Sequence, residues 1–457
     1  MKAAHFWLLL ALVIGCGCSK KRQSEPVRPL IDAGPLFQDE IRFELAVYYL
    51  PAPEHQPEDV LNRLLSAEFA QWKHVESIEG PAGSLMLATR SITDVQKTYA
   101  PPSLDSLRRF GRGISKEQAE AVQDTRFAYA VDFGYGKEHV WDGLVSAYKL
   151  IGQIATETGG LVWDEETREL FSPEEWETRR ITSWETEVPV IERHTVIHAY
   201  RSGTFVRCIT LGMSKFGLPD VVIENSSWEL NRNVGHIINL FSQSIAEGNS
   251  VDNPKEFILD FKKIKNDEVR EPQVTSFRKH ATGIARLSLH KGQWEDGDPK
   301  NRLIEIGFEN YDGPDLHARQ EKMITEAFGW EDSVTKVTPN KALKEASERA
   351  RAKLPALRNA FNAGLAPAET IQVKAPFKTI SGGKEFMWVE VTSWNKSKIE
   401  GLLKNEPFDV PGLHGGQIVE IAEADVFDYI RRYPDKREEG NETGKIIEEQ
   451  GGMETSK

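Results

Sequence analysis

Two hydrophobic periodicities, one of strands and one of helices, alternate along most of the chain and predict an α+β fold. Ile41 to Leu50 is rich in aromatic and branched residues, a composition typical of a strand. From Lys137 to Thr158 the apolar residues recur at intervals of three and four, which predicts the clearest helix in the chain. Gly159-Gly160 predicts where that helix ends. We therefore expect a multidomain protein with mixed and antiparallel sheets and packed helices.

The middle of the chain repeats this order of strands followed by a long helix. Val188 to Arg201 and Gly203 to Met213 predict paired strands. Asn225 to Ser227 precedes an amphipathic stretch and predicts the start of a helix. Ser172-Pro173-Glu174-Glu175 combines a serine cap, an early proline and a glutamate at the third helical position, so a further helix is expected there.

Breaks in the pattern divide the chain into six predicted segments. They are a signal peptide over 1–15, a lipidated tether over 16–40, a small α+β unit over 41–102, an α+β domain over 104–335, a small domain over 340–435 and a disordered acidic tail over 436–457.

The N-terminus has the layout of an export signal. Lys2 is followed by an apolar stretch from Phe6 to Ile14, which is about half of the roughly 20 residues needed to span a bilayer. The segment Val13-Ile14-Gly15-Cys16 resembles the lipobox of bacterial lipoproteins, in which the cysteine is lipidated and becomes the first residue. The alternative is an ordinary cleaved signal with a chance cysteine. By the same resemblance, Gly17 is not an aspartate-type retention signal, so we expect an outer-membrane anchor facing the periplasm.

Composition narrows the possible partners. The 457 residues carry a net charge of −13, which argues against nucleic acid, because phosphate binding requires a basic face. After lipidation of Cys16, Cys18 and Cys208 are the remaining thiols, and a disulfide between them would join a linker to a core strand. We expect a membrane contact through the lipid and a protein partner in the cell envelope, without a cofactor.

The C-terminal region predicts one helix followed by a sheet. Pro339-Asn340 begins a helical stretch that reaches Phe361, and Pro355 is expected to kink or split it. Strands are expected at Thr370 to Phe377, Lys384 to Thr392, Lys398 to Leu403 and Gln417 to Ile421, with Asp425 to Arg431 as a closing helical turn.

Several sequence motifs of this region are familiar. IQVKAPF at 371–377, EFMWVEV at 385–391, GLLKNEPFDVPGLHGGQIVEI at 401–421 and the following DVFDYI resemble the YegJ-like family, a bacterial domain of unknown function. The resemblance implies a small helix-plus-curved-sheet domain, often in exported or lipid-anchored proteins. It implies no reaction and no ligand.

Eight residues stand in the matching motifs and are candidates for a binding face: Lys374, Glu385, Trp388, Asn405, Glu406, Pro407, His414 and Asp428. In one interpretation they line a concave face with one aromatic platform. In the interpretation that we favour, Asn405 and Pro407 shape turns while Trp388 packs.

No catalytic or metal-binding motif stands out. The segment from Gly212 to Gly217 (GMSKFG) has one residue too many for a nucleophile elbow. His194 and His198 are expected on one face of a strand, too far apart to share a zinc ion. The loop from Glu295 to Asp298 could hold calcium, but it lacks the alternating ligands of a calcium loop.

Acidic residues offer one further catalytic candidate. Asp164-Glu165-Glu166 and Glu174-Glu175 could pair carboxylates for glycoside chemistry. Helix capping already explains Glu175, so we expect no catalytic residues here.

The sequence thus predicts a lipid-anchored envelope protein with a non-catalytic binding role. Two alternatives stay open. One is a hydrolase of unrecognised type in the middle domain, which a cleft with converging acid, base and nucleophile would support and a filled, apolar interior would exclude. The other is an inhibitor or immunity-like protein directed against a secreted toxin.

Overall fold

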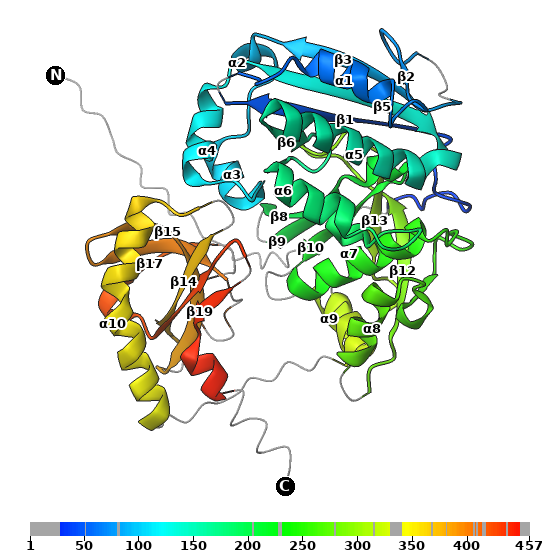
Figure 1. Ribbon diagram of the computed structural model, residues 1–457. Coiled ribbons are helices and arrows are strands. Elements are labelled where there is room, and N and C mark those ends of the chain that lie inside the picture. The colour runs from blue at the N-terminus through cyan, green and yellow to red at the C-terminus, as the bar shows by residue number, and fades with distance from the viewer. Residues whose placement is uncertain are drawn as a thin grey trace, which may run out of the picture.

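The computed structural model contains three β-sheets flanked by helices, so the α+β prediction is confirmed (Figure 1). It describes residues 28–447 except 51, 80–82, 203–204, 227–230, 278–279, 314–315, 330–340, 367–368, 381, 405–406, 408–409, 414–416 and 436. Two sheets are mixed and the third is antiparallel throughout. Of the helices in these residues, none is long and apolar enough to cross a membrane.

The first sheet is built around β1 (Glu40–Tyr49), whose inward side chains are almost all buried. β1 pairs with β5 (Ala128–Gly136) and β6 (Gly160–Asp164), both antiparallel. The outer strands are β2 (Lys73–His74), β3 (Met86–Ile92), β7 (Glu169–Phe171) and β4 (Gly111–Arg112). Because β1 and β3 both pair with β5, this sheet crosses the boundary that the sequence predicts at 102–104.

Helix α5 (Val140–Thr158) covers this sheet with the apolar stripe that the sequence predicts, and Gly159 ends it in the left-handed conformation (φ 72°). The predicted serine cap is also present, since Ser172 Oγ accepts a 3.2 Å hydrogen bond from the Glu175 amide. The helix that it opens, α6 (Pro173–Trp176), continues into a π-helical turn over Glu177–Thr182. The other helices are α1 (Pro57–Leu65), α2 (Val95–Thr98), α3 (Leu104–Phe110) and α4 (Lys116–Ala121).

The second sheet has the strand order β11-β12-β13-β10-β9-β8. Its strands are β8 (Val196–Ser202), β9 (Phe205–Leu211), β10 (Asp220–Ser226), β11 (Phe257–Asp260), β12 (Ile284–Lys291) and β13 (Leu303–Gly307). The helices are α7 (Asn231–Ala246), α8 (Asp267–Thr275) and α9 (Leu316–Phe328). The strand predicted from Val188 starts later, because Ile191–Arg193 forms a 3₁₀ turn. Asn225 and Ser226 end β10 instead of beginning a helix.

Residues 28–38 lie along the second sheet, so the predicted tether over 16–40 is wrong for this part. Leu30 bridges to His290 and Gly34 bridges to Val251. The Leu36 side chain is buried and belongs to the hydrophobic core that the first and second sheets share. Cys16 and the rest of the predicted tether lie outside the described residues.

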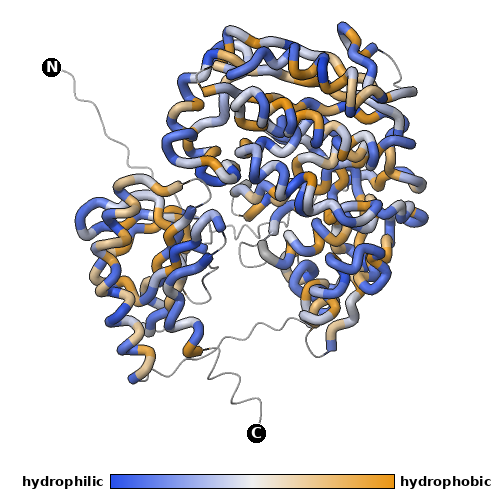
Figure 2. Tube along the Cα trace, viewed as in Figure 1, coloured by the Kyte–Doolittle hydropathy of each residue, from blue (hydrophilic) through white to orange (hydrophobic). Residues whose placement is uncertain are grey.

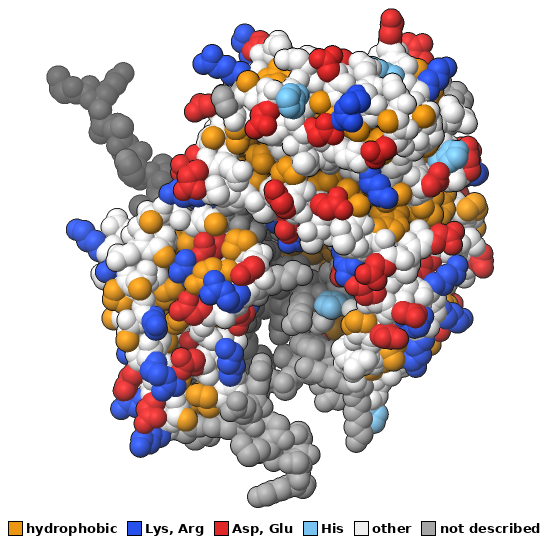
Figure 3. All heavy atoms as spheres, viewed as in Figure 1, with side chains coloured by type: hydrophobic (Ala, Val, Ile, Leu, Met, Phe, Trp, Pro, Cys, Tyr) orange, Lys and Arg blue, Asp and Glu red, His pale blue; other side chains and the backbone are white. Residues whose placement is uncertain are grey.

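One hydrophobic core runs from Leu36 to Ala327 and joins the first two sheets into one body. The C-terminal region has its own core, which extends from Ala350 to Tyr429. In Figure 2 the hydrophobic segments of both bodies concentrate on their strands and on the inner sides of their helices. Acidic and basic side chains are interspersed on the face drawn in Figure 3.

The C-terminal sheet has the order β17-β16-β15-β14-β18-β19 and packs against helix α10 (Lys341–Ala363). Its strands are β14 (Thr370–Lys378), β15 (Lys384–Asn395), β16 (Lys398–Leu403), β17 (Ile418–Ala422), β18 (Asp428–Arg432) and β19 (Glu438–Gly440). Pro355 lies inside α10 without splitting it.

Two predictions for this region are wrong. The expected closing helical turn at Asp425 to Arg431 is mostly β18, which pairs with β14. The expectation of a disordered tail over 436–457 is wrong for Glu438–Gly440, because β19 pairs with β18. Residues 448–457 lie outside the described residues.

Candidate functional site

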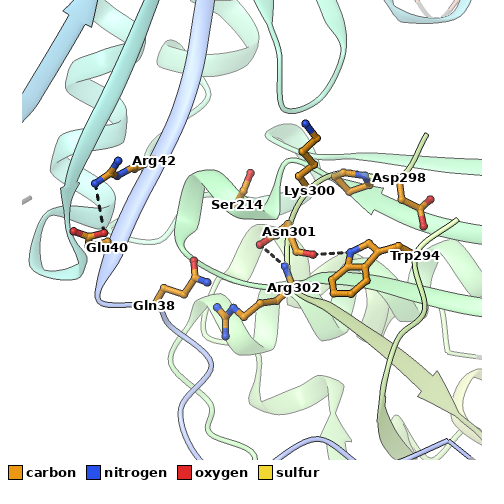
Figure 4. A pocket seen from close by; sticks show the side chains of 10 residues that line it. Gln38, Glu40, Arg42, Ser214, Trp294, Asp298, Lys300, Asn301 and Arg302 are labelled. Atoms are coloured by element: carbon orange, nitrogen blue, oxygen red, sulfur yellow. Dashed lines mark hydrogen bonds and ion pairs between the residues drawn. The ribbon is translucent and has the colours of Figure 1, made fainter. Parts of the chain in front are cut away.

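A cavity of about 700 Å³ lies where the first sheet meets the second (Figure 4). One wall comes from the start of β1 and the other from the loop between β12 and β13. Figure 4 shows Ser214 between these walls, with Arg42 and Glu40 on one side and Trp294 and Lys300 on the other. The lining residues are Gln38, Glu40, Arg42, Ser214, Trp294, Asp298, Pro299, Lys300, Asn301 and Arg302.

Two tight turns meet behind this cavity. One joins β6 to β7 and carries Glu166 and Thr167, and the other joins β9 to β10 and carries Ser214. A Cβ atom on Gly212 would lie 2.7 Å from Thr167 Cγ2, and Gly212 has a φ of 103°. Only glycine therefore allows the two turns to pack this closely in this backbone conformation.

Asp164 fastens the two turns to each other. Its Oδ1 accepts hydrogen bonds of 3.2 Å from the amides of Glu166 and Thr167 within its own turn. Its Oδ2 accepts a 2.5 Å hydrogen bond from Lys215 Nζ in the other turn. Asp164 thus shapes the turn that carries Glu166 and also holds Lys215, the neighbour of Ser214 in the other turn.

These charged groups are completely enclosed. Asp164 and Lys215 are both 0% exposed, and Arg180 lies 3.6 Å from Asp164 and 2.6 Å from Glu169. Burial acts to raise the pKa of Asp164, but Lys215 and Arg180 outweigh it and hold the pKa below its ordinary value. Buried ion pairs contribute little net stability and instead fix geometry, so this cluster sets how the two turns meet.

Ser214, which lines the cavity, forms a hydroxyl–carboxylate pair with Glu166. Ser214 Oγ donates a 2.6 Å hydrogen bond to Glu166 Oε2. Burial raises the pKa of Glu166 above its ordinary value, and this effect exceeds the lowering by Ser214. The pair has the separation of a nucleophile and its general base.

Arg302 brings a positive charge to the cavity without a protein counter-charge. Its guanidinium donates hydrogen bonds to the backbone oxygens of Leu36 (2.7 Å) and Gly217 (2.9 Å). Its Nε is buried without a hydrogen-bond partner, and no described carboxylate lies within ion-pair distance of it. Burial lowers the pKa of Arg302 below its ordinary value. An anion in the cavity would supply the missing counter-charge.

The loop that carries Arg302 also gives this wall an aromatic surface. Trp294 is 62% exposed, yet its indole Nε1 donates a 2.8 Å hydrogen bond to the Asn301 backbone oxygen. Asn301 is itself fixed, since its side-chain amide donates to Asp220 and to the Leu218 backbone oxygen, each at 2.8 Å. The exposed indole face is therefore held in place for stacking against a flat or ring-shaped ligand.

In the C-terminal body, three of the sequence-predicted residues stand in one row across the sheet. Lys374 on β14 is opposite Trp388 on β15 and opposite Asp428 on β18. Lys374 Nζ lies 5.4 Å from the centre of the Trp388 ring, and burial lowers the pKa of the lysine. Glu385 lies nearer the start of β15, opposite Phe377. Asn405, Glu406 and His414 lie outside the described residues.

Asp428 has a structural role in this row. It is 0% exposed, and its Oδ2 accepts hydrogen bonds from the amide (2.8 Å) and hydroxyl (2.6 Å) of Thr443. Asp428 thereby fastens the segment after β19 to the sheet. Lys374 and Trp388 are only partly buried, so they form the accessible part of the row.

The two histidines considered as zinc ligands, His194 and His198, pack against different aromatic rings. His194 is 0% exposed and stacks on Tyr148 at 5.7 Å, while His198 on β8 stacks on Phe110 at 4.6 Å. Asp298 of the acidic loop is paired with Arg207 at 2.7 Å. Within the described residues, no group of three or more His, Cys, Asp or Glu side chains is arranged to hold a metal ion.

Comparison with known proteins identifies one domain. Residues 340–453 match the model of DUF2314, described as an uncharacterized protein conserved in bacteria. The resemblance to a bacterial domain of unknown function is thus confirmed in these general terms. No curated protein and no solved structure matches the chain.

The structure brings together two residues that the sequence does not connect. In the sequence, Glu166 belongs to an acidic run that suggests glycoside chemistry, and Ser214 lies in a segment one residue too long for a nucleophile elbow. The signal that could have linked them is the pair of glycines, Gly212 and Gly217, around a serine at a strand end. Their contact depends on the packing of two sheets, which sequence spacing does not reveal.

Proposed function

We propose that this protein is a lipid-anchored protein of the bacterial cell envelope that binds an anionic small molecule in the cavity around Ser214. The anchoring rests on the lipobox-like segment ending at Cys16, and an outer-membrane position facing the periplasm follows from Gly17. The binding rests on Arg302, whose half-buried charge has no counter-charge among the described residues. The exposed face of Trp294 favours a ligand that combines the anionic group with a ring.

The anchoring proposal limits how far the body can move from the membrane. Arg28 already forms an ion pair with Glu305 on the second sheet. Only residues 17–27 then separate the lipidated cysteine from the folded body. At about 3.5 Å per extended residue, this connection reaches at most about 40 Å. The cavity thus stays near the bilayer surface, facing soluble compounds of the envelope.

Replacing Cys16 tests the anchor. In a bacterial host, Cys16→Ser should move the protein from the membrane fraction to the soluble fraction, because the acyl chains supply the attachment. Cys18→Ser is the matched control and should leave the protein in the membrane fraction. Mass spectrometry of the processed wild type should find acyl chains on Cys16; an unmodified N-terminus there would refute the anchor.

Replacing Arg302 tests the binding site. Calorimetry of the purified body with glucuronate should detect binding, while neutral glucose should bind much more weakly. Arg302→Met should weaken glucuronate binding about tenfold to a hundredfold, since a charged hydrogen bond contributes about 1.5–3 kcal/mol. Arg302→Lys should recover part of the loss. Equal affinity of wild type and Arg302→Met for glucuronate, or for inorganic phosphate as a second anion, would contradict the proposal.

The alternative of a hydrolase in the middle domain is favoured by one specific observation. Ser214 lines the cavity and donates a hydrogen bond to Glu166, so a candidate nucleophile and a candidate base meet there. These are two of the three groups, acid, base and nucleophile, expected of a hydrolase in this domain.

A further inference from the structure

We propose that Ser214 is a nucleophile and Glu166 its general base, and that the cavity cleaves carboxylic esters whose acyl part carries an anionic group. This inference rests on the proposed anionic ligand of the same cavity and adds a reaction to it. It is argued from the placement of the serine, the placement of the carboxylate and the device that aligns the two.

The position of Ser214 exposes its side chain to the cavity, which a nucleophilic serine requires. Ser214 lies in a 3₁₀ turn at the end of strand β9, between two glycines with left-handed backbones, Gly212 and Gly217. It is partly exposed and lines the cavity. The chain contains a useful contrast in Ser288, which also hydrogen-bonds to a carboxylate, Glu309, but is only 2% exposed and does not line this cavity.

The carboxylate is placed to remove the proton of that serine. Glu166 Oε2 accepts the Ser214 hydroxyl at 2.6 Å, within the range for proton transfer to a general base. Burial favours the protonated form of Glu166, which makes the carboxylate a stronger base than one in water.

A third residue aligns nucleophile and base, as such pairs require. Asp164 holds the Glu166 amide through Oδ1 and Lys215, the neighbour of Ser214, through Oδ2. Because Asp164 touches neither the cavity nor the proposed reacting atoms, it is a positioning residue.

The reaction balances with water as the only co-reactant. The Ser214 hydroxyl gives its proton to Glu166 while its oxygen bonds to the ester carbonyl carbon. The bond from that carbon to the alcohol oxygen breaks, and Glu166 returns the proton to the leaving alkoxide. Water then attacks the acyl-serine, passes one proton to Glu166 and releases the carboxylic acid, after which Ser214 regains its proton. Lys300 and Arg302 line the same cavity and supply positive charge for the acyl anion and for the developing oxyanion.

Covalent labelling with a fluorophosphonate probe tests the nucleophile in the full-length protein. We expect mass spectrometry to find the adduct on Ser214 in the wild type. Ser214→Ala should abolish it, and Glu166→Gln should slow it at least tenfold, since general base catalysis typically contributes a hundredfold or more. Ser288→Ala should label as the wild type does. Absence of a Ser214 adduct, or equal labelling of Glu166→Gln, would overturn the inference.

Hydrolysis of p-nitrophenyl succinate and p-nitrophenyl acetate tests the substrate class. The anionic succinate ester should be cleaved faster than the acetate ester, and Ser214→Ala should lose both activities. Equal hydrolysis by wild type and Ser214→Ala would count against the proposed reaction. Ser214→Ala should still bind glucuronate through Arg302, so failure of the reaction and failure of the binding site are separately visible.

Discussion

Replacing Asp164 with Asn should destabilise the N-terminal body by about 3–5 kcal/mol, although the two side chains have nearly the same shape. The change removes one negative charge from a cluster in which Lys215 and Arg180 are both at most 2% exposed. Lys215 would then have to stay charged without its partner or lose its proton at neutral pH. Urea denaturation followed by tryptophan fluorescence measures the effect.

The loss of stability in Asp164→Asn should come from the buried, unpaired charge of Lys215 and not from the loss of an attractive contact. The double variant Asp164→Asn/Lys215→Met removes both charges and should recover a large part of the stability, because a buried pair replaced as a unit is often neutral. A double-mutant cycle isolates this coupling. If the two single effects simply add, the buried-charge explanation is wrong.

An exposed ion pair provides the matched control. Lys137 and Asp39 form a pair of the same type at 2.5 Å, with side chains 57% and 88% exposed. Lys137→Met should leave the urea midpoint unchanged within error, because solvent and salt screen such pairs. The contrast tests whether enclosure, and not pairing alone, makes the Asp164 cluster sensitive.

Local patterns in the sequence predicted individual elements well. Helix α5 was recognised from its apolar spacing and its glycine end, and β1 from its aromatic and branched residues. Both signals act within one element, where the periodicity of side chains determines which face is buried. The cap at Ser172 was recognised for the same reason, since a cap depends on four consecutive residues.

Features that depend on distant segments were missed. The run DVVIENS of β10 contains charged and polar residues and does not predict a strand, because its burial follows from pairing with β9 and β13. Residues 28–38 looked like a tether, because the second sheet that holds them is formed by residues beyond 195. The pairing of Ser214 with Glu166 likewise requires two sheets to share one core, which no local pattern encodes.

His194 and Asp220 should shift the stability of the folded body in opposite directions as pH changes. His194 is buried among Tyr148, Trp184 and the cations Arg180, Lys215 and Arg193, and burial first, then these cations, holds its pKa well below the ordinary value. Burial raises the pKa of Asp220 to about 7, although Asn301 and Thr210 donate hydrogen bonds to it. Measurements on the wild type alone would combine both effects, so variants are needed.

For His194 the unfolded chain takes up a proton below pH about 6.5, while the folded state cannot, so stability is lost as pH falls. The glutamine of His194→Gln does not titrate. As the pH falls from 7.5 to 5, the free energy of unfolding of this variant should therefore rise by about 2 kcal/mol relative to that of the wild type, at about 1.4 kcal/mol per pH unit. Asp220→Asn should show the opposite sign. The stability contributed by protonated Asp220 is present at low pH and lost as pH rises through about 7, so this variant should gain on the wild type by about 2–3 kcal/mol between pH 5 and pH 8.

Urea denaturation of each variant at these pH values gives the differences directly, and any fixed cost of a substitution cancels between two pH values. Parallel stability profiles of wild type and His194→Gln would show that His194 is protonated in the folded state. A protonated imidazole there would need a carboxylate within reach, and neither ring nitrogen has a hydrogen-bond partner among the described residues. The opposite signs expected for His194 and Asp220 therefore test the enclosure of both groups, since a solvent-filled interior would flatten both profiles.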